Sequence, residues 1–342
     1  MTKYPSGEIE PNANILARNY QTSQNVRARF MLYDFADEPM DMEAIVIDGL
    51  GLKSNETVVD VGTADGNFLK RLEIEYGHTG LLLGVEPNYT QANKQEPAWD
   101  PMSTGELAKS LSMNRNRSKI ENIGASMLQD IIKTFDENEP YKFNIVAATA
   151  DAIPLKSNIA GAVTGFSVLY HLKKDDRPVA FNEFKRLGDR FAGSTSGETN
   201  KANHRLIEQE IGEYLSQIGI ETTVPAPMNT GFTTEKAKLE LPQYYTNVYM
   251  VEQNCKMLIN TAFRAERYLN SLMSMWNQFD PVPPEEAYRE ILLSRVYPMI
   301  NRVMLNNPDR SFIDHISRSA FICSDEPINP GNGFERVYAD AA

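Results

Sequence analysis

The chain has 342 residues, of which 42% are apolar and 23% charged, a composition ordinary for a folded protein of one large or two smaller domains. Its 46 acidic residues outnumber the 34 basic ones, and the net charge of −12 argues against a nucleic-acid partner and against binding to anionic membrane surfaces. No apolar run reaches the ~18 residues that span a bilayer, and the polar start of the chain has no secretory signal. We therefore expect a cytoplasmic protein.

Apolar periodicity predicts helices and buried strands in alternation through the first two thirds of the chain. Two helices come first, over about residues 10–37 and 42–50. The expected strands are 57–61, 81–85, 143–148, 160–166 and 190–195, and the expected helices among them are 67–76, 118–135 and 175–187. Because these strands are apolar throughout and alternate with helices, we expect an α/β fold with a parallel sheet covered by helices on both faces.

The last third of the chain is expected to add to this sheet. An amphipathic helix is expected around 207–218 and a strand at 244–251. Prolines separate two expected helices, over 261–278 and 284–305, and a final strand is expected at 312–324. The two cysteines and four histidines are too scattered to form a zinc-type site, so we expect no metal.

The turn after the first strand carries the clearest chemical signal. It has the spacing Asp60-x-Gly62-x-x-x-Gly66 and opens the helix that starts near Asn67. Glycines at such a turn let the backbone approach a ligand closely. A dinucleotide fingerprint needs further glycines where this chain has Ala64 and Asn67, so a nicotinamide-dependent oxidoreductase is disfavoured.

The acid-x-Gly pattern resembles the first motif of class I S-adenosylmethionine-dependent methyltransferases, with Ala64 in place of the middle glycine. The resemblance implies a Rossmann-like, seven-stranded, mostly parallel sheet and S-adenosyl-L-methionine as cofactor, with S-adenosyl-L-homocysteine as product. It places the cofactor against the first motif, which comprises Asp60, Gly62, Thr63, Ala64, Asp65 and Gly66. Asp65 would either cap the following helix or contact the amino group of the methionine portion.

Three later segments continue the resemblance in the same order. Glu86, followed by Pro87, ends the second strand, where the family has an acid for the ribose hydroxyls. Asp151 and Ala152 resemble the segment that receives the adenine. Phe166, at the end of the fourth strand, begins a segment similar to the one that flanks the transferred methyl group.

The residues after the fourth strand decide which methyltransferase is expected. They lack the Pro-Pro-aromatic motif of enzymes that methylate base amines, so we expect a small-molecule acceptor. His171, next to Tyr170, is the best-placed general base, and the alternative is a histidine that only starts a helix. His204 and two tyrosines of the N-terminal helix, Tyr20 and Tyr33, are candidate substrate contacts, although packing is the more common role for each.

The expected organisation has three parts: an N-terminal helical lid (1–50), a cofactor-binding core (51–220) with an insertion at 93–117, and a C-terminal part (221–342) whose helices at about 261–305 cap the site. The function expected is methyl transfer to an oxygen, nitrogen or carbon of a small molecule such as a specialised metabolite. The alternative is a cofactor-binding scaffold or regulator without activity, supported only by Ala64 and Asp65. The sequence leaves open whether the protein forms a homodimer.

Overall fold

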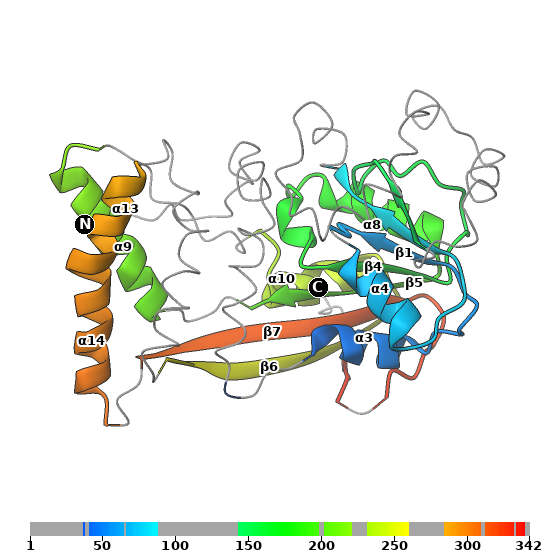
Figure 1. Ribbon diagram of the computed structural model, residues 1–342. Helices are drawn as coiled ribbons and strands as arrows, with labels where there is room; N and C mark the ends of the chain where they lie inside the picture. Colours follow the sequence, from blue (N-terminus) through cyan, green and yellow to red (C-terminus); the bar gives the residue numbers. More distant parts are fainter. Residues whose placement is uncertain are drawn as a thin grey trace. The chain divides into compact units, whose positions relative to one another are not determined.

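The structure, a computed structural model, describes Asp37 and residues 41–64, 66–87, 143–197, 202–220, 231–259, 284–308, 312–331 and 333–338 (Figure 1). The expected helices at 118–135 and 261–278 and the insertion at 93–117 lie outside these residues, as does all but Asp37 of the expected helix at 10–37.

The described strands form one sheet in the order β3-β2-β1-β4-β5-β7-β6-β8. The pairs β3–β2, β2–β1, β1–β4 and β4–β5 are parallel, and β6–β8 is antiparallel. The strands are β1 (Val58–Val61), β2 (Leu82–Val85), β3 (Phe143–Val146), β4 (Ala162–Phe166), β5 (Arg190–Ser196), β6 (Asn247–Ile259), β7 (Phe312–Ser324) and β8 (Glu335–Val337). The expected α/β fold with a mostly parallel sheet is confirmed, and β8 is an eighth strand that the sequence did not indicate.

Helices cover both faces of the parallel part of the sheet, as expected. Val58 and Leu82 pack with the helices α3 and α4, whereas the next residues, Val59 and Leu83, pack in a second cluster with α8. This alternation follows from the two-residue period of a strand.

The helical elements are α3 (Met42–Leu50), α4 (Asn67–Ile74), α8 (Arg177–Leu187), α9 (Ala202–Gln217), α10 (Thr234–Glu240), α13 (Glu285–Ile291) and α14 (Tyr297–Asn306), with short 3-10 turns η4 (Leu169–His171) and η6 (Leu241–Gln243). The expected helix at 284–305 is thus α13 and α14, joined by a π-helical turn, η7 (Leu292–Val296).

Local sequence explains where the helices before and after β1 begin and end. Asp41 caps α3, because its side chain accepts a hydrogen bond from the amide of Ala44 at 3.0 Å. Gly51 ends α3 in the left-handed conformation, as a C-terminal glycine commonly does. Gly66 occupies the N-cap position of α4, so Asp65 is not the residue at the cap position of this helix.

The chain forms two compact units, each built from three segments. The first comprises 1–40, 196–231 and 253–318, and the second comprises 41–195, 232–252 and 319–342. In the first unit, α9, α13 and α14 share an apolar core with the second half of β6. Among the described residues, no helix combines the length and the apolar character needed to cross a membrane.

Candidate active site

The strand order reverses beside β1 in the second unit. The chain runs from β1 through α4 to β2 on one side, and it later returns to place β4 on the other side of β1. In open α/β sheets, ligands bind at such a switch point, outside the carboxyl ends of the strands. The residues that follow β1, β2 and β4 are therefore the candidates for a site.

The loop after β1 turns sharply at this position. Gly62, Ala64 and Gly66 all have left-handed backbones, with φ of 73°, 49° and 72°. The amides of Gly62 and Thr63 donate to the carbonyl of Val85 on β2, at 2.8 and 3.3 Å. Ala64 therefore adopts a conformation that glycine would adopt freely, at a steric cost that glycine avoids.

The loop after β1 also interlocks with the segment after β4. A Cβ atom on Gly62 would lie 2.5 Å from Cγ2 of Val168, so the valine side chain fills the space that glycine leaves. Ser167, just before it, has a left-handed backbone with φ of 53°, and its amide donates to the carbonyl of Ser194 at 3.1 Å. Non-glycine residues held in this conformation are often found at functional sites.

Asp60 is the buried acid of the site. Its side chain is 3% exposed and accepts a hydrogen bond from the Thr164 hydroxyl of β4 at 2.7 Å. Burial raises the pKa of Asp60 to about 7, against the opposing effect of the Thr164 and Thr63 hydroxyls. The Thr63 hydroxyl lies near this carboxyl, but it completes no hydrogen bond within the described residues.

Glu86 reaches back from the end of β2 to the loop. Its Oε2 atom accepts a hydrogen bond from the amide of Ala64 at 3.1 Å, and Pro87 after it is exposed. The carboxylate therefore lies beside the glycine-bearing turn. Asp65, the next residue of that loop, lies outside the described part of the chain.

The segment expected to receive adenine is a fixed turn. Asp151 and Ala152 are exposed, and the Ala152 amide already donates to the carbonyl of Thr149 at 3.2 Å. Arg186 of α8 anchors the turn by donating to the carbonyl of Ile153 at 2.9 Å. The Ala152 amide is thus engaged within the turn, whereas the Asp151 side chain faces solvent.

The residues at the end of β4 and in the turn after it are partly buried. The ring of Phe166 packs on Phe68 of α4 with a centroid distance of 4.5 Å, which places it partly in the core. Tyr170 and His171 lie in the turn η4, with ring centroids 4.1 Å apart, and both are half-buried. The His171 amide donates to the carbonyl of Val168, so this turn is connected to the residue that fills Gly62.

The remaining predicted residues are not brought to this site by the described structure. Tyr20 and Tyr33 lie outside the described residues. His204 lies on α9, in the other compact unit, and its side chain is not among those described. Within the described residues, no group of three or more His, Cys, Asp or Glu side chains is arranged to hold a metal ion.

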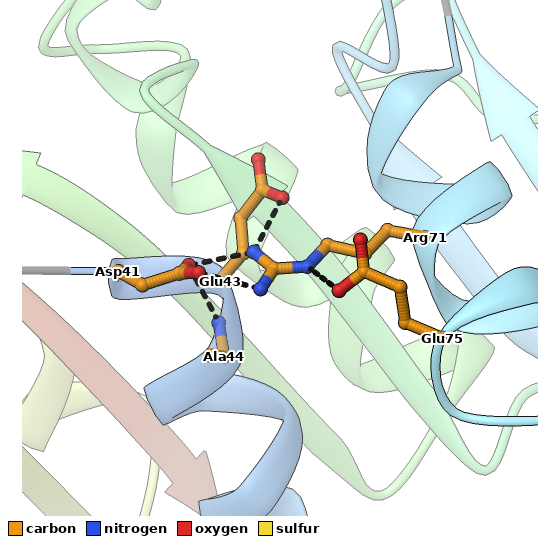
Figure 2. A network of polar contacts seen from close by, with 5 residues as sticks. All are labelled: Asp41, Glu43, Ala44, Arg71 and Glu75. Carbon is orange, nitrogen blue, oxygen red and sulfur yellow. Dashed lines mark hydrogen bonds and ion pairs between the residues drawn. The ribbon is translucent and has the colours of Figure 1, made fainter.

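An arginine that the sequence did not indicate joins the helices before and after β1. Arg71 of α4 pairs with Asp41 and Glu43 at the start of α3, and with Glu75 one turn further along α4 (Figure 2). Its guanidinium lowers the pKa of the Asp41 carboxyl by hydrogen bonding. A single arginine in an amphipathic helix gives no sequence signal of this kind, because its partners lie about thirty residues earlier.

Thr164 was also missed, although the sequence holds a signal for it. It is a buried hydroxyl in an otherwise apolar strand, and the register places it directly opposite Asp60. A buried hydroxyl normally has a hydrogen-bond partner, and the acid of the neighbouring strand is that partner here.

Comparison with known proteins gives likenesses in structure alone. No protein family model matches the chain, and no curated protein matches it in sequence. Mycolic acid cyclopropane synthase CmaA1, solved with SAH and CTAB, is 11% identical, with 92% of this chain and 99% of that chain covered and a TM-score of 0.42.

Two further solved structures are similar at the same level. Phosphoethanolamine N-methyltransferase 2 of Haemonchus contortus, solved with S-adenosyl-L-methionine, is 11% identical, covers 94% of this chain and 62% of its own, and has a TM-score of 0.40. An SAM-dependent methyltransferase of Aquifex aeolicus is 17% identical, with 60% and 92% covered and a TM-score of 0.32. Because these TM-scores are low, the fold of the chain is assigned from its own strand order.

Proposed function

We propose that this chain is an S-adenosylmethionine-dependent methyltransferase with a small-molecule acceptor. The observation that carries the proposal is the arrangement at the switch point beside β1. There the loop with left-handed residues Gly62, Ala64 and Gly66, the buried acid Asp60 and the carboxylate of Glu86 lie together at the carboxyl end of the parallel strands.

The chemistry of these groups suits a cationic, hydroxyl-bearing ligand. Asp60 and Glu86 supply acceptors, and the buried Thr63 hydroxyl has no completed hydrogen bond within the described residues. A pyrophosphate would be repelled by the two carboxyl groups, which further disfavours a nicotinamide cofactor. When bound, S-adenosylmethionine supplies an activated methyl group on a positively charged sulfur. In this proposal, Asp60 and Thr63 face the methionine end, and Glu86 and Pro87 face the ribose.

Other predicted residues take their roles in the same proposal. Asp151 accepts a hydrogen bond from the adenine amino group, and the Ala152 turn forms the edge of that subsite. The half-buried pair Tyr170 and His171 faces the acceptor. His171 takes the proton from the acceptor nucleophile where that nucleophile does not ionise by itself.

The organisation of the whole chain is part of the proposal. Residues 1–50 would act as a lid and the helices over 261–305 as a cap, with Tyr20, Tyr33 and His204 facing the substrate. Cytoplasmic location and a homodimer belong to the same set of expectations.

Calorimetric titration of the protein with S-adenosylmethionine, S-adenosylhomocysteine and NAD tests the cofactor. We expect the first two to bind and NAD not to bind. Turnover is then measured as S-adenosylhomocysteine formed with a panel of phenols, carboxylates and amines. Binding of NAD in preference to both adenosyl ligands would overturn the proposal. Binding of the adenosyl ligands without turnover of any acceptor would favour the alternative, a cofactor-binding scaffold or regulator without activity.

A further inference from the structure

Asp60 lies between two strands that bring it no positive charge. The register places Gly84 of β2 and Thr164 of β4 opposite it, and the Thr164 hydroxyl donates a hydrogen bond to its carboxyl group at 2.7 Å. Ionising a carboxyl group that is buried in this way costs free energy, because the carboxylate loses its hydration and has no nearby cation among the described residues to offset that loss.

Within the described residues, the charged groups that act on Asp60 from other elements are acidic. They are Glu43 of α3 and Glu86 at the end of β2, and both raise the pKa of Asp60 further. Glu43 lies 3.4 Å from the guanidinium of Arg71, but that guanidinium also pairs with two other carboxylates (Figure 2). Among the described residues, no cation forms an ion pair with Asp60 itself. The site therefore has an acid that is only half ionised near neutral pH.

We propose that Asp60 and Thr164 form a charge-sensing pair: Asp60 releases its proton to solvent when a ligand with a cationic sulfur enters, and retains more of it when the sulfur is neutral. The pair would thus let the site distinguish S-adenosylmethionine from S-adenosylhomocysteine. This inference rests on the proposed function and adds to it a coupling between ligand charge and protonation.

The size of the coupling follows from electrostatics. A unit positive charge at ~6 Å, with an effective dielectric constant of ~20, lowers the pKa of a carboxyl group by about two. Starting from a pKa of about 7, Asp60 would then release about 0.8 proton per S-adenosylmethionine bound at pH 6, and about 0.5 proton at pH 7. The affinity for S-adenosylmethionine, relative to S-adenosylhomocysteine, should rise about 20-fold from pH 5.5 to 7.5.

The number of protons released is measured by calorimetry at pH 6 in two buffers of different ionisation enthalpy. The parent protein should release most of a proton with S-adenosylmethionine and less with S-adenosylhomocysteine, which has the same ammonium and carboxylate groups but no charge on its sulfur. Asp60→Asn, which resembles the protonated acid in shape, should release none with either ligand. Thr164→Val keeps the shape of the strand but removes the hydroxyl that favours ionisation, so proton release should move to higher pH.

Glu75→Gln is the matched control, because it removes a carboxylate from the Arg71 network while leaving Asp60 and its neighbours in place. It should release the same number of protons as the parent. Equal proton release with both ligands, binding of S-adenosylmethionine without proton release, or parent-like release by Asp60→Asn would each overturn the inference while leaving the proposed function intact. If neither ligand binds the parent between pH 5.5 and 7.5, the proposed function fails and the inference fails with it.

Discussion

Ala64→Gly separates two explanations of the missing glycine. If the alanine marks a decayed cofactor loop, restoring glycine should restore binding. The structure favours the other explanation, because Ala64 already has the left-handed conformation, with φ of 49°, and its amide is held by Glu86 at 3.1 Å. The loop is therefore formed with alanine in place, and the cost of the substitution is a cost in stability.

The magnitude comes from two opposing effects. A left-handed backbone costs a residue with a Cβ roughly 1–2 kcal/mol, and glycine removes that cost. Glycine also gives the unfolded chain more freedom, which costs about 0.4–1 kcal/mol. We expect Ala64→Gly to raise the free energy of unfolding by about 0.5–1 kcal/mol. The strain is present with and without ligand, so the affinity for S-adenosylhomocysteine should change less than about twofold.

Urea unfolding and calorimetry with S-adenosylhomocysteine measure both quantities. Asn158→Gly is the matched control, because Asn158 is also left-handed, with φ of 56°, and lies in a turn away from the candidate site. The gain in the free energy of unfolding should be smaller for Asn158→Gly, since asparagine tolerates this conformation better than alanine. A tenfold gain in affinity for Ala64→Gly would refute the reasoning and favour a decayed loop, and so would a clear loss of stability.

Other variants test the remaining parts of the site. The contribution of Asp60 to stability should fall by roughly 3 kcal/mol as pH rises from about 4 to 7, because the folded state binds the Asp60 proton more tightly than the unfolded state; in urea titrations at several pH values, the parent should lose this much stability relative to Asp60→Asn. Glu86→Ala should weaken cofactor binding by roughly 1.5–3 kcal/mol, and unchanged affinity in calorimetry would remove Glu86 from the site. His171→Asn should lower turnover by ~10²–10⁴-fold with little change in cofactor affinity, and turnover within about threefold would reject a general base. Arg177→Met should cost about 3 kcal/mol in urea unfolding, since it removes a buried guanidinium that donates to both carboxylate oxygens of Glu240, and replacing both residues with methionine should recover part of this loss.

The parallel part of the sheet could be predicted because its strands β1, β2 and β4 are short and mostly apolar. β1 and β2 are buried along their whole length, so their sequences contain no polar alternation that would suggest another arrangement. The motif residues Asp60 and Glu86 could be placed for a related reason, since parallel strands bring their carboxyl ends to one edge.

The end of β6 could not be predicted as easily. The expected strand stopped at Val251, whereas β6 continues to Ile259. In this second half, Cys255, Met257 and Ile259 are buried between residues that are more exposed. Cysteine and methionine are not among the β-branched and aromatic residues that indicate a strand, and only the packing against α9 and α13 shows why these buried positions alternate.

Gly62 shows why a motif can be identified before its physical role is understood. In the sequence, glycine at that position indicates a close approach of backbone to ligand. In the structure, the space that it leaves is filled by Val168, whose carbonyl accepts the amide of His171. The glycine therefore joins the loop expected to hold the cofactor to the turn expected to face the acceptor. Because these two loops interlock through the Val168 side chain, a movement of the first loop on ligand binding should displace the second loop.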